Sequence, residues 1–257
     1  GAHVLELFHG PTLSFKDVAM GVLISLTDYF LTRRGERKHM LVATTGDTGP
    51  AAAWASAGKR AIDCWVLWPR GLVSEEQATQ VAAIEAGNVH AVEVEACPRG
   101  ADSLDETVAA LFEDAELSRA ANLGTPNSVN WLRPLVQTVP YFYAFLQLRN
   151  KHSTAGAKPP TFVVPTGAFG NALGAFLAQK MGLPINIVAA NNANAAVHRA
   201  WTSGVWSEAA LLRTPSSAMD QAVPYNLHRL FYFAAGSDAA TKHKALQDAF
   251  ARDGRVE

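Results

Sequence analysis

Hydrophobic residues follow two different spacings along the chain, and each spacing predicts a type of element. Short continuous apolar runs, typical of strands buried in a parallel sheet, occupy residues 40–43, 62–68, 89–94, 161–164 and 183–190. Apolar residues three or four positions apart, or runs of small helix-forming residues, predict helices over 17–32, 50–58, 75–85, 102–120, the stretch after 133, 172–181, the stretch after 194 and 239–252. Strands that alternate with helices predict an α/β fold with parallel sheets.

Residues that favour helix ends set several of these boundaries. Gly35, which follows two arginines, is expected to end the first helix. Asp102 or Ser103 is expected to cap the helix that runs to residue 120, and the asparagines of 191–194 to cap the helix that follows them. Pro140 lies inside an apolar helix and predicts a kink there.

The composition predicts a globular protein of one large or two modest domains, because 257 residues with 49% hydrophobic content can build a substantial core. Lys and Arg total 22 against 23 for Asp and Glu, so the chain lacks the basic surplus that marks nucleic-acid binders. No apolar run is long enough to cross a bilayer. We therefore expect a small-molecule substrate as partner, and neither nucleic acid nor a membrane.

Cysteine and histidine usage narrows the location and the chemistry. The two cysteines, Cys64 and Cys97, cannot form a disulfide framework and suit a reducing compartment, which predicts a cytoplasmic protein. The eight histidines show none of the spacings that hold zinc. We expect no metal site.

Lys16 is the chemical centre of the segment 6–17. The turn pair Gly10 and Pro11 leads into Leu13 and Phe15, and the lysine stands at the start of a helix. An amine packed beside an aromatic ring at the positive end of a helix is disfavoured in its charged form, so it can act as a nucleophile. The alternative is a solvated lysine at a helix start.

Two glycine-containing loops join a strand to a helix and predict anion sites. Residues 44–49 precede a helix with Pro50 in its first turn, and residues 165–171 precede the helix 172–181. The first N–H groups of a helix have no partner within it and point at a ligand. The second loop is the better phosphate site, and it lacks the lysine of a nucleotide P-loop. The first loop, taken alone, also fits a simple capped turn.

Residues 126–133 gather hydrogen-bond donors before an apolar helix. Asn127, Ser128, Asn130 and Arg133 lie at one end of it, and an arginine suits a bidentate contact with phosphate. An ordinary helix cap with a surface arginine fits the same residues equally well.

Segments 5–17, 44–50, 127–133, 165–171 and 214–220, in this order, resemble those of threonine synthases, a branch of the fold type II enzymes that use pyridoxal 5'-phosphate (PLP). The resemblance implies that Lys16 is the catalytic residue and carries PLP as a Schiff base. It implies further cofactor contacts from Asp47, Gly167, Ala168, Phe169, Gly170 and Asn171. Substrate contacts are implied for Thr45, Thr48, Ser128, Asn130 and Arg133. Ala168 stands where the family has an asparagine.

The implied architecture is an α/β fold of type II, similar to tryptophan synthase β, with two lobes that each contain a mostly parallel sheet flanked by helices. Residues 1–17 and 146–257 would form the larger, PLP-binding lobe, and residues 18–145 the smaller, substrate-binding lobe. PLP would lie in the cleft between the lobes of a monomer or homodimer.

The implied reaction, in threonine biosynthesis, is that of a lyase that converts O-phospho-L-homoserine and water to L-threonine and phosphate, with Lys16 moving protons at the substrate carbons. Two alternatives stay open: a related PLP-dependent lyase or dehydratase on a hydroxy or phospho amino acid, and a fragment that binds PLP or phosphate without catalysis. The chain opens without methionine, and no residue matches the family's last segment, whose hydroxyl faces the pyridine nitrogen. We therefore expect a piece of a longer enzyme.

Overall fold

The structure is a computed structural model, and it describes residues 1–95, 97, 101–151, 158–207, 209–234, 236–253 and 255–256. The chain divides into two compact units, residues 1–136 and residues 137–257. Each unit is described by itself. The unit boundary differs from the lobe boundaries expected from the resemblance, because segment 1–17 belongs to the first unit and residues 137–145 to the second. The division into a PLP-binding and a substrate-binding lobe stays a prediction.

The first unit contains a parallel sheet of four strands in the order β3-β2-β1-β4. The strands are β1 (Lys38–Ala43), β2 (Ile62–Pro69), β3 (Val89–Val94) and β4 (Leu123–Gly124). The first three match the predicted apolar runs, whereas β4 is too short to carry a hydrophobic pattern. Its helices are α1 (Lys16–Arg34), α2 (Thr48–Ser56), α3 (Glu75–Ala82), α4 (Ala101–Glu113), α5 (Ala115–Ala120) and α6 (Leu132–Val136).

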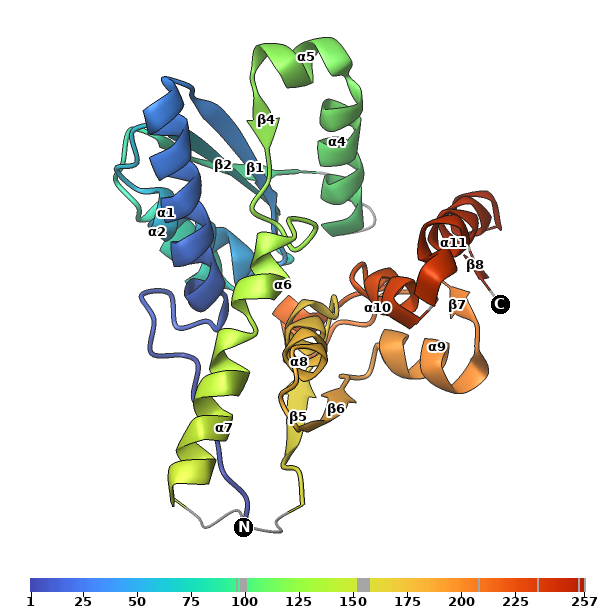
Figure 1. Ribbon diagram of the computed structural model, residues 1–257. Coiled ribbons are helices and arrows are strands. Elements are labelled where there is room, and N and C mark those ends of the chain that lie inside the picture. The colour runs from blue at the N-terminus through green and yellow to red at the C-terminus, as the bar shows by residue number, and fades with distance from the viewer. Residues whose placement is uncertain are drawn as a thin grey trace. The chain divides into compact units, whose positions relative to one another are not determined.

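Helices cover both faces of this sheet, α1 and α2 on one side and α4 on the other (Figure 1). The alternation of side chains along β1 explains both layers. Met40 and Val42 pack into the core under α1 and α2, whereas Leu41 and Ala43 pack toward α4. Because a strand buried on both faces has no polar side, it appears in the sequence as a continuous apolar run.

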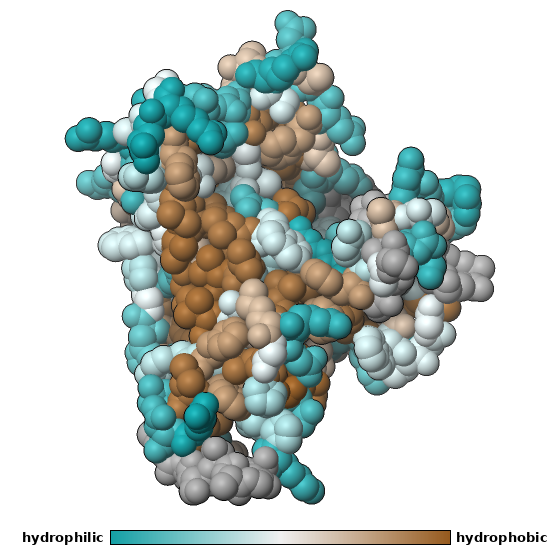
Figure 2. All heavy atoms as spheres, viewed as in Figure 1, coloured by the Kyte–Doolittle hydropathy of each residue, from teal (hydrophilic) through white to brown (hydrophobic). Residues whose placement is uncertain are grey.

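Helix α1 carries more apolar surface than the first unit buries. It ends as predicted at Gly35, whose left-handed backbone (φ 66°) lets its N–H reach the carbonyls of Leu31 and Thr32. Met20 and Leu23 are fully buried, yet other apolar residues of the same helix are exposed, among them Val22, Leu26, Tyr29 and Phe30. Figure 2 shows the resulting brown area over α1. The apolar spacing therefore predicted the helix correctly but not which side of it is buried.

The second unit is built around a two-stranded parallel sheet of β5 (Thr161–Pro165) and β6 (Asn186–Ala190). A single apolar core joins this sheet to α8 (Gly170–Lys180) and includes Val164, Leu173 and Leu227. The other elements are α7 (Val139–Lys151), α9 (Ala196–Ser203), β7 (Trp206–Ser207), the 3₁₀ turns η1 (Ser217–Met219) and η2 (Gly236–Asp238), α10 (Leu227–Ala234), α11 (Ala239–Asp253) and β8 (Arg255–Val256).

Two predicted helix boundaries are wrong. The helix expected from Asp102 or Ser103 to residue 120 begins at Ala101, so neither residue precedes it, and it stops before Asp114. The Asp114 carboxylate accepts the N–H groups of Glu116 and Leu117 and so caps the new helix α5.

The kink expected at Pro140 is also wrong. The apolar stretch is divided into α6 and α7, and Pro140 is the second residue of α7. In the first turn of a helix a proline loses no hydrogen bond, because the N–H that it lacks would have no partner there. The N-cap position of α9 is Ala195 and not one of the expected asparagines, although the side chain of Asn191 accepts the N–H of His198 in the first turn.

None of the helices in the described part of the chain combines the length and the apolar character that crossing a bilayer requires.

Candidate active site

The turn before α1 fixes where Lys16 stands. The Asp17 carboxylate accepts both the backbone N–H of Thr12, at 3.0 Å, and its hydroxyl, at 2.7 Å. Gly10 packs so closely against the Asp17 side chain that a Cβ atom on Gly10 would collide with it. The turn pair noted in the sequence therefore has a mechanical role, which is to close the loop onto the first turn of α1.

The Lys16 amine is buried and touches one carboxylate. Only 10% of its side chain is exposed, and its Nζ lies 2.8 Å from Asp47 Oδ2 and 4.6 Å from the centre of the Phe15 ring. Burial lowers the Lys16 pKa below its ordinary value of 10.5; the Asp47 charge opposes this shift and the Arg133 charge adds to it. The environment expected for a nucleophilic lysine is therefore present.

Asp47 is itself held by a second residue, which the sequence did not single out. Its Oδ1 accepts a hydrogen bond of 2.6 Å from the side-chain amide of Gln77 on α3, while Oδ2 faces Lys16. Gly46 has a backbone φ of 149°, and a Cβ atom there would overlap the Gln77 amide. Glycine at position 46 therefore gives Gln77 the room to reach Asp47.

The loop 44–49 differs in detail from the predicted anion cradle. The Thr44 hydroxyl accepts the N–H groups of Gly46, at 3.0 Å, and of Gly49, at 2.9 Å, so part of the cradle is already filled. Thr44, which no prediction used, organises the loop. Thr45 and Thr48 are half-buried, and their hydroxyl groups make no hydrogen bond within the described residues. These two hydroxyls are therefore free to contact a ligand.

Arg133 is the second buried cation of the first unit, with 3% of the residue exposed. Its Nη1 donates to the carbonyl of Pro126 at 2.7 Å, its Nε has no partner, and it forms no ion pair within the described residues. Burial lowers its pKa to about 10. The surface arginine of the alternative interpretation is therefore wrong, and a buried guanidinium without a carboxylate is suited to an anion.

The other two candidates of the segment 126–133 are partly buried. Asn130 uses its side chain within the segment, since Oδ1 accepts the N–H of Leu132 and Nδ2 donates to the carbonyl of Thr125, both at 3.1 Å. Ser128 lies two residues before it and is half-buried. Asn130 thus shapes the approach to α6, and the substrate contacts of Ser128 and Asn130 stay predictions.

In the second unit, the loop before α8 presents a row of unused amides. Within the part of the chain that the structure describes, no hydrogen bond is donated by the backbone N–H groups of Gly167, Ala168, Phe169, Gly170 and Asn171. Successive free N–H groups at a helix N-terminus form an anion site. Phe169 has a left-handed backbone (φ 66°), which is strained for a residue with a side chain and typical of functional loops.

Two asparagines orient this loop through its carbonyls. Asn191 donates to the carbonyl of Thr166 at 2.8 Å, and Asn226 donates to the carbonyl of Ala168 through both its backbone N–H, at 3.1 Å, and its side chain, at 2.9 Å. In a trans peptide the next N–H points opposite to the carbonyl, so the amides of Gly167 and Phe169 point away from the asparagines.

The turn 214–220 supports the same loop. A Cβ atom on Gly167 would lie 3.0 Å from the backbone of Met219, so only glycine fits without a shift. The Asp220 carboxylate ties this turn to the end of β6, because it accepts hydrogen bonds from Thr214 and from the side chains of Asn192 and Asn194. The turn that the sequence noted without a role thus contacts and supports the loop before α8.

A comparison with protein families identifies the family that contains both the Lys16 segment and the loop 167–171. Residues 4–238 match the family described as "Pyridoxal-phosphate dependent enzyme". The chain belongs to the pyridoxal-phosphate-dependent enzyme family. The match covers the Lys16 segment and the loop 167–171 alike, and it confirms the family expected from the motifs.

Relatives within this family carry threonine synthase names. The chain is 40% identical to mouse "Threonine synthase-like 2" over 98% of its own length, and 39% identical to the threonine synthase of Saccharomyces cerevisiae over 91%. These alignments cover 52% and 46% of the two relatives, so the chain spans about half the length of the curated proteins it matches.

Solved structures of the family confirm the fold. PLP-bound threonine synthase from Brucella melitensis matches with a TM-score of 0.85 and 38% identity, and yeast threonine synthase with 0.86 and 33%. Each match covers 98% of this chain and 52% of the solved chain. The fold type II α/β prediction is therefore confirmed.

The residues of this chain fit the family's cofactor. An aldehyde requires an amine that is uncharged at moderate pH, and the burial of Lys16 favours that form. A phosphate requires several donors that are not already used, and the loop Gly167–Asn171 has them. The loss of the asparagine side chain at Ala168 leaves these backbone donors in place.

Sequence reasoning did not find Gln77 and Asn226, which support Asp47 and Ala168. Gln77 lies on a helix that looks like an ordinary surface helix, and Asn226 lies in no motif. The sequence shows only that a glycine precedes Asp47, and the structure explains this glycine by the approach of the Gln77 side chain.

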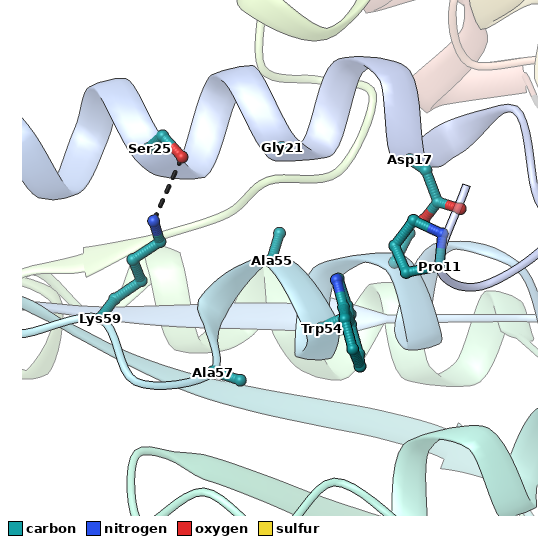
Figure 3. A pocket seen from close by; sticks show the side chains of 9 residues that line it. Pro11, Asp17, Gly21, Ser25, Trp54, Ala55, Ala57 and Lys59 are labelled. Carbon is teal, nitrogen blue, oxygen red and sulfur yellow. Dashed lines mark hydrogen bonds between the residues drawn. The ribbon is translucent and has the colours of Figure 1, made fainter.

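A separate hollow of about 340 Å³ lies between α1 and α2 in the first unit (Figure 3). Its lining includes Asp17, Gly21, Trp54 and Lys59, and the Lys59 amine reaches the Ser25 hydroxyl at 3.2 Å. Lys16 and Asp47 are not in this lining, so the hollow is not the site described above. Within the described residues no group of three or more His, Cys, Asp or Glu side chains could hold a metal ion.

Proposed function

We propose that Lys16 holds PLP through its amine, that Asp47 lies near the ring, and that the amides of Gly167–Asn171 hold the phosphate. The observation that carries this proposal is the buried Lys16 amine, 2.8 Å from Asp47, in a chain of this family. When bound, PLP supplies the electron sink that makes the α-carbon of an amino acid acidic. The protein contributes binding, orientation and proton transfer.

We further propose the threonine synthase reaction, conversion of O-phospho-L-homoserine and water to L-threonine and phosphate. The names of the relatives and solved structures at 33–40% identity support it. The Lys16 amine is the group placed to move protons at the α and β carbons of the substrate. The free hydroxyls of Thr45 and Thr48 are suited to the substrate carboxylate.

Arg133 is suited to the phosphate that leaves. Its buried guanidinium has an unpartnered Nε, and a charged donor in a dry site stabilises developing negative charge more strongly than one in water. Ser128 and Asn130 are the nearby hydroxyl and amide in the same segment.

A related PLP-dependent lyase or dehydratase is the second candidate, and a chain that binds PLP without turnover is the third. The second and third candidates are retained because the chain spans about half the length of its threonine synthase relatives. Cytoplasmic location and the monomeric or homodimeric state also stay predictions.

The test begins with absorbance. Purified protein with added PLP should show a band near the visible that borohydride removes, and the Lys16→Ala variant should lack this band. Lys59→Ala, which changes a half-buried lysine outside the site, is the matched control and should keep it. A wild-type protein without the band would contradict the assignment of Lys16.

Incubation with O-phospho-L-homoserine then separates the candidates. Threonine together with released phosphate supports the synthase, 2-oxobutyrate supports the lyase or dehydratase, and neither product supports a binding protein without turnover. Activity that survives Lys16→Ala would contradict the whole mechanism.

A further inference from the structure

The carboxylate that faces Lys16 is fixed by a residue that takes no part in the motifs. Asp47 stands between two donors, the Lys16 amine at 2.8 Å on Oδ2 and the Gln77 amide at 2.6 Å on Oδ1. A carboxylate that accepts a hydrogen bond on each oxygen cannot rotate without breaking one of them. Its orientation toward the lysine therefore depends on both partners.

Gln77 is held in place from its own side. The Ser74 side chain caps α3 by accepting the Gln77 backbone N–H at 3.2 Å. The Gln77 amide lies against Gly46, where a Cβ atom would overlap it, and its buried Oε1 has no partner among the described residues. A buried acceptor left unsatisfied costs free energy, and the hydrogen bond to Asp47 offsets part of that cost.

A glutamine suits this place because it donates a hydrogen bond without adding charge. The charged groups that act on the Lys16 amine are Asp47, from the loop before α2, and Arg133, from α6. A lysine or arginine at position 77 would compete with Lys16 for Asp47, whereas a neutral amide leaves the negative charge to Lys16.

We propose that Gln77 is a positioning residue, which aims Asp47 at the Lys16 amine and thereby sets the pH at which that amine becomes reactive toward an aldehyde. This inference rests on the proposed function of Lys16. Gln77 touches neither the reacting atoms nor the cofactor in this role and acts through Asp47 alone.

The test measures the pH dependence of cofactor capture by the cofactor-free chain. The second-order rate constant for reaction with PLP, followed by absorbance, should rise with pH and level off, with a midpoint that reports the Lys16 amine. In Gln77→Leu the carboxylate is free to turn away from Lys16. Its charge then stabilises the ammonium less, so the midpoint should fall by about half to one pH unit.

A second variant should shift the pH midpoint of PLP capture in the opposite direction. Gln77→Glu keeps the length of the side chain, removes the donor and adds a negative charge near Lys16, so the midpoint should rise by about half a pH unit or more. Gln80→Leu on the same helix is the matched control and should keep the wild-type midpoint. A general loss of packing in α3 would lower the melting temperature but would not move the two midpoints in opposite directions.

The outcomes separate the positioning role of Gln77 from the proposed function of Lys16. Opposite shifts support the positioning role, whereas two midpoints within about 0.2 pH unit of the wild type, or shifts in the same direction, overturn it. A wild-type chain that captures no PLP, or captures it equally well as Lys16→Ala, contradicts the proposed function instead. The two failures are therefore distinguishable.

Discussion

At the scale of single residues, the first unit buries two cations, Lys16 and Arg133. Lys16 and Arg133 are both less than a tenth exposed, and only Lys16 has an acidic partner among the described residues. An uncompensated buried charge opposes folding, and such cost is typical of sites that await a ligand. Two predictions follow from these charges.

The first prediction concerns the pH dependence of stability. The Lys16 pKa is lowered on folding, so between its folded value and 10.5 the unfolded chain binds more protons than the native one. Stability must then rise with pH in that window, by at most about 1.4 kcal/mol per pH unit. The cofactor-free wild type should gain stability relative to Lys16→Met between pH 7 and 10.5, measured by urea unfolding. A constant difference between the two proteins would contradict the buried amine.

The second prediction concerns Arg133, whose charge lowers the Lys16 pKa. Replacing it with methionine removes a buried charge and keeps an apolar stem. The pH midpoint of PLP capture should therefore rise, while the free energy of unfolding should stay within about 1 kcal/mol of the wild type or increase. Arg37→Met, which changes an exposed arginine, should leave the midpoint where it was. A fall in the midpoint would show that Arg133 does not act on Lys16 through its charge.

At the scale of elements, the loop before α8 owes its shape to its carbonyl partners. The carbonyl of Ala168 accepts two bonds from Asn226, and the Asn226 Oδ1 in turn accepts a bond of 2.8 Å from Arg229. The side chain of Ala168 contributes no donor, so the loop depends on backbone amides that these contacts orient.

Asn226→Asp should test this dependence. The carboxylate keeps the shape and the contact with Arg229 but cannot donate to Ala168, and two oxygens would then face each other. We expect the dissociation constant for PLP to rise about tenfold, which corresponds to about 1.4 kcal/mol, as measured by fluorescence titration of the cofactor-free chain. Asn186→Asp, at an exposed asparagine whose amide reaches only the Pro159 carbonyl at 3.4 Å, is the control. Equal affinities in both variants would mean that the loop keeps its shape without Asn226.

Some elements could be predicted from the sequence alone and others could not. The strands over 40–43 and 62–68 were predictable because burial on both faces leaves a continuous apolar run. The apolar run 161–164 also predicted its strand correctly, although Val163 of that strand is exposed. The break at Asp114 was not, since an aspartate inside an amphipathic stretch looks like any solvated acid until its carboxylate is seen capping a new helix. Lys16 and the loop 167–171 could be proposed as site residues because their motifs are local in sequence, and their roles stay predictions. Gln77 and Asn226 could not be proposed, because the residues that they contact lie 30 and 58 positions away.

At the scale of the whole chain, the two compact units have separate cores, and each contains some of the residues that we propose to bind PLP. The apolar cores of residues 1–136 use α1, α2, α4 and the four-stranded sheet, whereas that of residues 137–257 uses α8 and the pair β5 and β6. Lys16 and Asp47 belong to the first unit and the loop Gly167–Asn171 to the second. A ligand that contacts residues of both units stabilises both by mass action.

A comparison of PLP with pyridoxal tests whether one ligand contacts both units. PLP should slow amide hydrogen exchange in peptides of both units, whereas pyridoxal, which lacks the phosphate, should protect mainly residues around Lys16. In Lys16→Ala, PLP should still protect the loop before α8 but should lose its effect on the first unit, because a ligand stabilises only the segments that it contacts and those that unfold with them. Protection by PLP that is confined to one unit in the wild type would mean that Lys16 and Gly167–Asn171 do not serve the same ligand.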